Sequence, residues 1–314
     1  MQVKVFSLGG AQWEVDGQED MRVRDVKGLL ESLAGVIVRE QRLLAGTAEP
    51  ADEQAVAALP AKSRGHLTLL RRDAEQALWL ELAKGEHFHA DALLTAPEHI
   101  RDDYEVVMAA VSSRGRSLRL ASDELRADRR IVLAAVAQAG EALEYASAEL
   151  RADRDVVLRA VQQSGHALMH AAEPLAGDRA LVLAAVGRTG GALRHAGAAM
   201  RADPEVVLAA ALKDSSALRY ADDALLSDLD LMSAVVKRHG SALKYASDEL
   251  RSNRELVLTA VRQDSSAFKY VIPELRADRH FVLQAVQANS FKIECSRHAL
   301  RTDTEAQRSP IGTQ

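Results

Sequence analysis

The sequence has little of several residues that would point to a particular class of protein. Among its 314 residues there is one cysteine, Cys295, so no intramolecular disulfide can form, and we expect a reducing compartment. Aromatic residues make up only 4% of the chain, although apolar residues make up 47%. An apolar content dominated by Ala, Val and Leu suits many small helix contacts better than the core of a β-sandwich.

Long apolar runs and excess positive charge are also missing. No stretch approaches the roughly 18 uninterrupted apolar residues of a membrane span. The start, MQVKVFSLGG, lacks the apolar region of a secretory signal. The net charge of −5 differs from that of a strongly basic nucleic-acid binder. We therefore expect a cytoplasmic or nuclear protein with no membrane partner, and protein rather than nucleic acid as its partner.

Motifs of catalytic sites are absent as well. The chain contains no phosphate-binding loop of the G-x-x-x-x-G-K-[ST] type, no G-x-G-x-x-G, no G-x-S-x-G and no kinase signature. These absences predict a protein that is not an enzyme, with no catalytic residues and no cofactor.

What the sequence does contain is a repeat. Residues 101–300 divide into eight blocks of 25 residues without an insertion or deletion, and positions are counted here from the first residue of each block. Position 3 carries a residue that typically caps a helix N-terminus, namely Asp103, Asp128, Asp153, Asp178, Asp203, Asp228, Asn253 and Asp278. Position 15 carries a small residue, namely Gly115, Gly140, Gly165, Gly190, Ser215, Gly240, Ser265 and Ser290.

Each block predicts a pair of helices. After the cap comes a V-V-L-x-A-V-like stretch with apolar residues at helical spacing, which indicates a helix of about 11 residues with a broad buried face. The glycine of position 15 is expected to end this helix by adopting a positive φ. The A-L-x-Y-A stretch that follows it predicts a second short helix. One pair cannot bury its own apolar face, so stacked units predict an all-α solenoid.

The repeat resembles a known family. Its consensus, D-R-x-V-V-L-A-A-V-x-x-x-G-x-A-L-x-Y-A-S-x-E-L-R, is similar to the repeat catalogued as domain of unknown function 4116. The resemblance covers residues 101–300 and implies a helical repeat fold, but the family supplies no established activity. We expect residues 73–100 to form a degenerate capping unit or linker, and residues 301–314 to form a disordered tail.

Residues 1–72 have a different pattern, with short β-like runs on both sides of a helical stretch at residues 23–34. They resemble ubiquitin. The shared residues are Met1, Gln2 and Val3 at the start, Val26, Lys27 and Leu30 on the helix, Gln41 to Leu44 in the next strand, and Leu67, Leu69, Leu70, Arg71 and Arg72 at the end. The resemblance implies an α+β ubiquitin-like domain with a β-grasp fold.

Two consequences of this resemblance concern function. The aliphatic recognition patch of ubiquitin falls on Leu8, Leu44 and Leu70, which implies docking to a ubiquitin-receptor protein. Ubiquitin ends in a double glycine that is joined to targets, whereas here Arg72 is followed by Asp73 and the chain continues. We therefore expect an integral domain rather than a conjugated modifier.

Histidine and cysteine residues offer weak signals of metal or thiol chemistry. His166 and His170 share a helix face but lack the glutamate of H-E-x-x-H. His170 and His195 occupy position 20, where other blocks carry tyrosine, so a half-buried polar ring is favoured over a metal ligand. The same position holds Cys295, for which a buried structural role is favoured even though His298 is near it in sequence.

The pair His87 and His89, near His99, lacks further ligands for a metal ion. The sequence therefore predicts no metal site.

Basic residues recur at two positions of the repeat. Position 19 carries Arg194, Arg219, Lys244 and Lys269, and position 13 carries Arg188, Lys213 and Arg238. Because identical positions stack along a solenoid, these residues predict basic stripes that could hold an acidic segment. A solvated face is the alternative interpretation, since the array has 27 basic and 27 acidic residues.

Together these features predict a non-enzymatic adaptor. The solenoid would hold a protein partner, and the ubiquitin-like domain would dock to a ubiquitin-pathway receptor. The alternative function is a nucleic-acid-binding helical repeat, with one base stacked per unit on the tyrosine and histidine rings of position 20.

Overall fold

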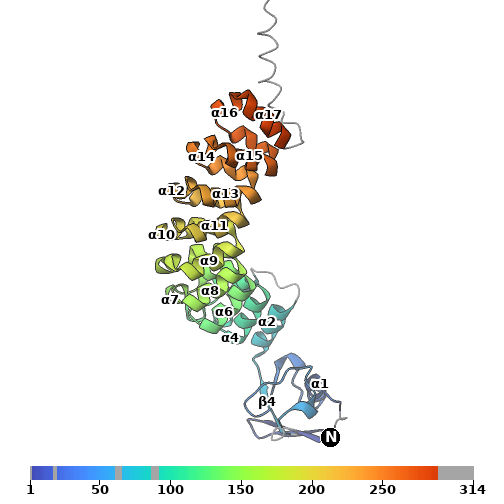
Figure 1. Cartoon of the computed structure of the whole chain (residues 1–314). Helices are drawn as coiled ribbons and strands as arrows, with labels where there is room; N and C mark the ends of the chain where they lie inside the picture. Colours follow the sequence, from blue (N-terminus) through green and yellow to red (C-terminus); the bar gives the residue numbers. More distant parts are fainter. Residues whose placement is uncertain (1, 17–19, 61–65, 86–91, 289–314) are drawn as a thin grey trace, which may run out of the picture. The chain divides into compact units, whose positions relative to one another are not determined.

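The computed structural model describes residues 2–16, 20–60, 66–85 and 92–288. The chain forms two compact units. The first comprises residues 1–113 and 120–122, and the second comprises residues 114–119 and everything from residue 123 onward. Figure 1 shows the order of the elements in each unit. None of the described helices is long and apolar enough to cross a bilayer.

The first unit begins with a four-stranded mixed sheet. Its strands are β1 (Gln2–Ser7), β2 (Gln12–Asp16), β3 (Gln41–Leu44) and β4 (His66–Arg71), arranged in the order β2-β1-β4-β3. The central strands β1 and β4 run parallel, and the outer strands pair antiparallel with them. With helix α1 (Val23–Ala34) between β2 and β3 in the chain, this is the predicted β-grasp arrangement.

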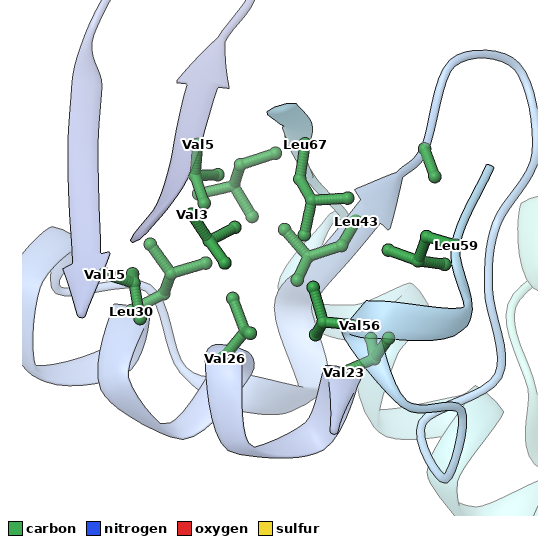
Figure 2. Close-up of a cluster of buried hydrophobic side chains, with 12 residues drawn as sticks. Val3, Val5, Val15, Val23, Val26, Leu30, Leu43, Val56, Leu59 and Leu67 are labelled. Atoms are coloured by element: carbon green, nitrogen blue, oxygen red, sulfur yellow. The ribbon is translucent and has the colours of Figure 1, made fainter. Parts of the chain in front are cut away.

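One face of the sheet packs on α1 to form the core. Alternate strand residues such as Val3, Val5 and Leu67 are buried, and Figure 2 shows them facing Val26 and Leu30 of the helix. The opposite face carries the residues between them, since successive side chains of a strand point to opposite sides. Two 3₁₀ turns, η1 (Val38–Glu40) and η2 (Val56–Ala58), complete the domain.

The chain then passes directly from β4 into a helix. The carboxylate of Asp73 accepts hydrogen bonds from the backbone N–H groups of Glu75 and Gln76 and so caps α2 (Ala74–Lys84). A helix therefore begins where ubiquitin has its double glycine. The helix α2 packs against α4 (Tyr104–Ser113), after η3 (Ala92–Thr95) and α3 (Glu98–Arg101).

The second unit repeats one three-part pattern, and this confirms the predicted solenoid of helical repeats. Each block has a ten-residue α-helix, a six-residue 3₁₀-helix and a short third helix. The long helices are α6 (Arg129–Gln138), α8 (Arg154–Gln163), α9 (Arg179–Arg188), α11 (Pro204–Lys213), α13 (Leu229–Arg238), α15 (Arg254–Gln263) and α17 (Arg279–Ala288). Figure 1 shows them one after another, with the short helices along one side.

The 3₁₀-helices follow the long helices. They are η4 (Gly115–Leu120), η5 (Gly140–Tyr145), η6 (Gly165–His170), η8 (Gly190–His195), η9 (Ser215–Tyr220), η10 (Gly240–Tyr245) and η11 (Ser265–Tyr270). The third helices are α5 (Asp123–Arg126), α7 (Ala148–Arg151), η7 (Glu173–Gly177), α10 (Ala198–Arg201), α12 (Asp223–Leu226), α14 (Asp248–Ser252) and α16 (Pro273–Ala277). The sequence prediction of two helices per block therefore missed one element, because A-L-x-Y belongs to the 3₁₀-helix and a separate helix follows it.

The predicted reason for the repeat glycines is wrong. Among the described residues only Gly10, Gly35 and Gly46 have a positive φ, and none of these belongs to the repeat. The repeat glycines instead allow a close approach between neighbouring units. A Cβ atom on Gly140 would lie 2.5 Å from the carbonyl oxygen of Ala160 in the next long helix.

Two further contacts connect several of the repeat blocks to the next block. The Nε of Arg154 donates to the carboxylate of Asp178 at 2.7 Å, while the same carboxylate caps α9 by accepting from the N–H of Leu181. Equivalent pairs join Arg129 to Asp153, Arg179 to Asp203 and Arg254 to Asp278. At the glycine, the N–H of Gly140 donates to Oε1 of Gln163 at 2.7 Å.

The close approach makes a matched test of glycine possible. Gly140→Ala should destabilise the protein by about 1–3 kcal/mol, because the added methyl group overpacks a backbone contact. Gly187→Ala is the control, since no heavy atom lies within 4 Å of a Cβ built at Gly187. This variant should be more stable than the unmodified chain by up to about 1 kcal/mol, because alanine is favoured over glycine in a helix interior. Urea denaturation followed by circular dichroism measures both. Equal stability of the two variants would contradict the role assigned to the repeat glycine.

Candidate protein-binding surfaces

The outer face of the sheet holds two of the three residues predicted for the ubiquitin-like patch. Leu44 pairs with Thr68, and Leu70 pairs with Arg42, across the antiparallel β3–β4 ladder. Both leucines are half-buried, and they alternate with the buried residues Leu43 and Leu69. The sheet therefore directs Leu44 and Leu70 away from α1.

Leu8 lies just beyond the end of β1 and is 83% exposed. It is the most exposed large apolar residue in the described part of the chain. Such a side chain in a turn beside an apolar sheet face is typical of a partner contact rather than of a core residue.

Two residues that the sequence prediction missed belong to the same face. Phe6 pairs with Thr68, the residue that also pairs with Leu44, so the three side chains form a row across three strands. The ring of Phe6 stacks on His66 with centroids 5.8 Å apart and planes 9° from parallel. Because Val3 and Val5 face the core, the alternation of side chains along β1 could have placed Phe6 on the outer face. The partner His66 could not be found this way, because the β1–β4 pairing is non-local.

An ion-pair cluster neutralises the arginines beside this patch. Arg42 contacts Glu49 at 2.7 Å and Glu105 of α4 at 2.9 Å. Arg72 contacts the same two glutamates at 3.0 and 3.1 Å, and only 11% of its side chain is exposed. The outer face therefore presents apolar side chains rather than positive charge. The term sheet patch is used below for the surface formed by Phe6, Leu8, Leu44, His66 and Leu70.

In the repeat region, the four basic residues of position 19 are exposed, and two of them lie over tyrosine rings. Lys244 Nζ lies 4.6 Å from the ring centroid of Tyr245, and Lys269 Nζ lies 4.8 Å from that of Tyr270. Tyr245 and Tyr220 raise the pKa of Arg219. Burial opposes ionisation of the Tyr245 phenol, but Arg219 and Lys244 outweigh it and lower that pKa.

The basic residues of position 13 lie at the C-terminal ends of the long helices. Arg188 donates to the carbonyl oxygen of Gln163 at 3.2 Å, in the way that Gln263 donates to the carbonyl of Arg238 at 2.9 Å. Position 13 thus connects the end of one long helix to the end of the preceding one. Lys213 and Arg238 are exposed at the same position.

Position 1 of the repeat carries a third set of basic residues, which the sequence prediction did not single out. Five of its arginines lie in the last turn of a short helix, are half-buried and have a buried Nε without a hydrogen-bond partner among the described residues, namely Arg101, Arg126, Arg151, Arg201 and Arg251. Arginine stands at the first position of six of the eight blocks, and this regularity was a signal in the sequence.

Two cavities lie along these arginines. One of about 340 Å³ is lined by Arg126, Tyr145 and Arg151, and an equivalent one of about 240 Å³ is lined by Arg201 and Tyr220. The same repeat positions therefore create the same kind of hollow in different units.

Comparison with known families decides the classification of the chain. Residues 88–126, 128–175, 178–226, 228–276 and 259–301 each match the model of a family described as "Domain of unknown function (DUF4116)". These matches cover more than half of the sequence. The chain belongs to the DUF4116 family. Each of the central matches spans two units of the DUF4116 array, which is the name used below for the repeats at residues 101–300. No curated protein matches the chain.

The histidines of the DUF4116 array form a cluster of half-buried rings. His166 and His195 meet edge to face with centroids 6.2 Å apart, and the Nε of Arg194 donates to Nε2 of His195 at 2.6 Å. In the described residues no group of three or more His, Cys, Asp or Glu is placed to hold a metal ion. His87, His89, Cys295 and His298 lie outside the described residues.

Burial and neighbouring positive groups control the protonation of this cluster. Burial, together with Arg194, His166 and His170, lowers the pKa of His195 to about 4. Burial also lowers the pKa of His170, where Arg151 acts in the same direction and Glu144 and Glu141 oppose it. Both rings are therefore neutral near pH 7. The Nε2 atom of His195 carries no proton, because it accepts the hydrogen bond from Arg194.

These pKa values predict an acid-sensitive fold. An unfolded histidine takes up a proton near pH 6.5, whereas His195 in the folded chain resists it until about pH 4. Stability is therefore present above about pH 6.5 and is lost as the pH falls toward 4, because the unfolded state binds more protons. The free energy of unfolding from urea titrations should drop between pH 7.5 and about 5.5.

Replacing the ring provides the control for this effect. His195→Tyr introduces the residue found at position 20 in four other units and should reduce the drop in stability. His280→Gln, at an exposed site on α17, should leave the drop unchanged. The assignment to His195 fails if the tyrosine variant retains the full pH dependence of the unmodified chain.

Proposed function

We propose that the chain is a non-enzymatic protein–protein adaptor in the cytoplasm or nucleus. One observation carries the proposal: two separate surfaces of different chemistry occur in one chain. The sheet patch offers one exposed and three half-buried apolar side chains, and the DUF4116 array offers stacked columns of polar and basic side chains. The sheet patch would dock to a ubiquitin-pathway receptor, and the array would hold a second protein.

The roles of the acidic residues support an adaptor over an enzyme. In the DUF4116 array the aspartates of position 3 cap the long helices, and four of them, Asp153, Asp178, Asp203 and Asp278, also pair with an arginine of the preceding unit. Stability accounts for these carboxylates without a catalytic role. The same argument applies to the histidine rings, which replace tyrosine at one repeat position.

The contacts of position 20 disfavour the alternative, a nucleic-acid-binding repeat. Stacking of bases requires open aromatic faces. Here the tyrosines are half-buried, and the ammonium groups of Lys244 and Lys269 lie over the rings of Tyr245 and Tyr270. A base would have to displace these cations, which supports a protein partner instead.

The docking role of the sheet patch can be tested with the full chain. Leu44→Ala should weaken binding to an isolated ubiquitin receptor by about tenfold, equivalent to about 1.4 kcal/mol, because it removes apolar contact area from the patch centre. Leu33→Ala is the matched control, since Leu33 is 54% exposed but lies on α1, away from the outer face of the sheet. Isothermal titration calorimetry measures both affinities.

Circular dichroism at the same temperature verifies that both variants remain folded. If the two leucine variants bind the receptor equally well, the sheet patch is not the docking surface. If the unmodified chain binds no receptor at all, the ubiquitin-pathway half of the adaptor proposal is wrong.

A further inference from the structure

The middle of the DUF4116 array differs in charge from the rest. The block at residues 176–200 contains one acidic residue, Asp178, and that carboxylate is already paired with Arg154. Its short helix α10 (Ala198–Arg201) has no acidic side chain, whereas α5, α12 and α14 each begin with an aspartate. Of the three arginines in this block, Arg179 pairs with Asp203 and Glu205 of the next block, whereas Arg188 and Arg194 form no ion pair with a described residue.

The arginines of position 1 show this difference directly. Arg126 pairs with Asp123 and Arg251 pairs with Asp248, each three residues earlier on the same short helix. At the equivalent places before Arg151 and Arg201 the chain has Ala148 and Ala198. Accordingly, Arg151 and Arg201 form no ion pair with any described residue, although their side chains are half-buried.

Other positive or polar groups lie near these two arginines. Arg151 is close enough to His170 to lower the pKa of that ring. Arg194 is exposed, and its Nε donates to the neutral ring of His195. Carboxylates line the same cavities, namely Glu144 beside Arg151 and Asp222 and Asp223 beside Arg201, but none of them forms an ion pair with these two arginines. These residues, Arg151, His170, Arg194, His195 and Arg201, are called the central arginine site.

We infer that the central arginine site binds an extended acidic segment of a protein partner, with separate carboxylates on Arg151 and Arg201. This inference rests on the proposed adaptor function and names where the array holds its partner. A half-buried guanidinium without an ion pair gains a charge-assisted hydrogen bond from a carboxylate. At Arg126 and Arg251 a ligand would first have to displace an aspartate.

The spacing of the two arginines indicates an extended chain rather than a small anion. Arg151 and Arg201 occupy the same position two repeats apart. Adjacent packed helices are about 8–10 Å apart, so two repeats correspond to about 16–20 Å. An extended peptide covers this distance in about six residues. One small anion can contact only one of the two guanidinium groups.

The test uses the full chain and a defined probe. The probe is a fluorescein-labelled Gly/Ser peptide with two pairs of glutamates about six residues apart, and its control has glutamine in place of glutamate. Binding is measured by fluorescence anisotropy at low ionic strength, because salt screens such contacts. We expect the glutamate peptide to bind and the glutamine peptide not to bind.

Paired variants separate this site from general charge attraction. The double variant Arg151→Ala, Arg201→Ala should weaken binding by about tenfold or more, since charge-assisted hydrogen bonds to two carboxylates are lost. The double variant Arg251→Ala, Arg254→Ala removes the same net charge from two arginines that lie outside this site and already pair with aspartates, and it should weaken binding less than about threefold. Equal effects of the two double variants would overturn the inference.

A second design tests the site without removing arginine. Ala148→Asp and Ala198→Asp recreate the internal pair found at Asp123–Arg126 and should abolish binding of the peptide while the fold is kept. Unchanged binding by this variant overturns the inference even if the alanine variants unfold. A single-stranded oligonucleotide of equal charge that binds more tightly through the same arginines would also overturn it, in favour of nucleic acid.

The two proposals fail in different ways. Absence of peptide binding, together with receptor binding at the sheet patch, removes the central arginine site and leaves the docking role intact. If the chain binds no receptor in the calorimetric test but binds the glutamate peptide selectively, the docking role of the sheet patch is wrong and the central arginine site stands.

Discussion

The aspartate that begins each long helix is the contact on which the DUF4116 array depends. Asp178 accepts from the N–H of Leu181 in its own helix and from Arg154 in the preceding unit, and both contacts lower its pKa. An exposed ion pair contributes only about 0–1 kcal/mol, whereas a helix cap contributes about 1 kcal/mol. The importance of the double contact is geometric, because a single carboxylate fixes where one helix starts and where its neighbour lies.

At one place both partners of the contact between units are replaced. Leu229 replaces the arginine that would pair with the next cap, and that cap is Asn253 rather than aspartate. Asn253 still accepts from the N–H of Leu256, so the capping contact remains after the ion pair is gone. Since each repeat contacts mainly its neighbours, such exchanges stay local. The same locality allows the block at residues 176–200 to have Asp178 as its one acidic residue and still keep its cap and the ion pair with Arg154.

The sequence predicted the period and the caps, because these follow from local chemistry repeated at fixed spacing. The β-grasp domain was implied by the resemblance of residues 1–72 to ubiquitin. The sequence could not predict why glycine occupies position 15. A positive φ and a close backbone approach both select glycine, and only the position of the Ala160 carbonyl 2.5 Å from a Cβ at Gly140 distinguishes them. Phe6 and His66 were missed for a similar reason, since their stacking depends on β1 and β4 lying side by side although they are far apart in sequence.

The candidate sites show why a count of charged residues is a poor guide to binding. Position 19 looked like a single basic stripe, yet Lys244 and Lys269 cover their own tyrosines, while Arg194 donates to a histidine. At position 1, Arg126 and Arg251 pair with an aspartate three residues earlier, whereas Arg151 and Arg201 have alanine there. An array with equal numbers of acidic and basic residues can therefore still select an acidic segment, because recognition depends on which charges lack an internal partner. Such recognition would be confined to the units where alanine replaces aspartate, and its strength would fall with added salt as the exposed parts of the contact are screened.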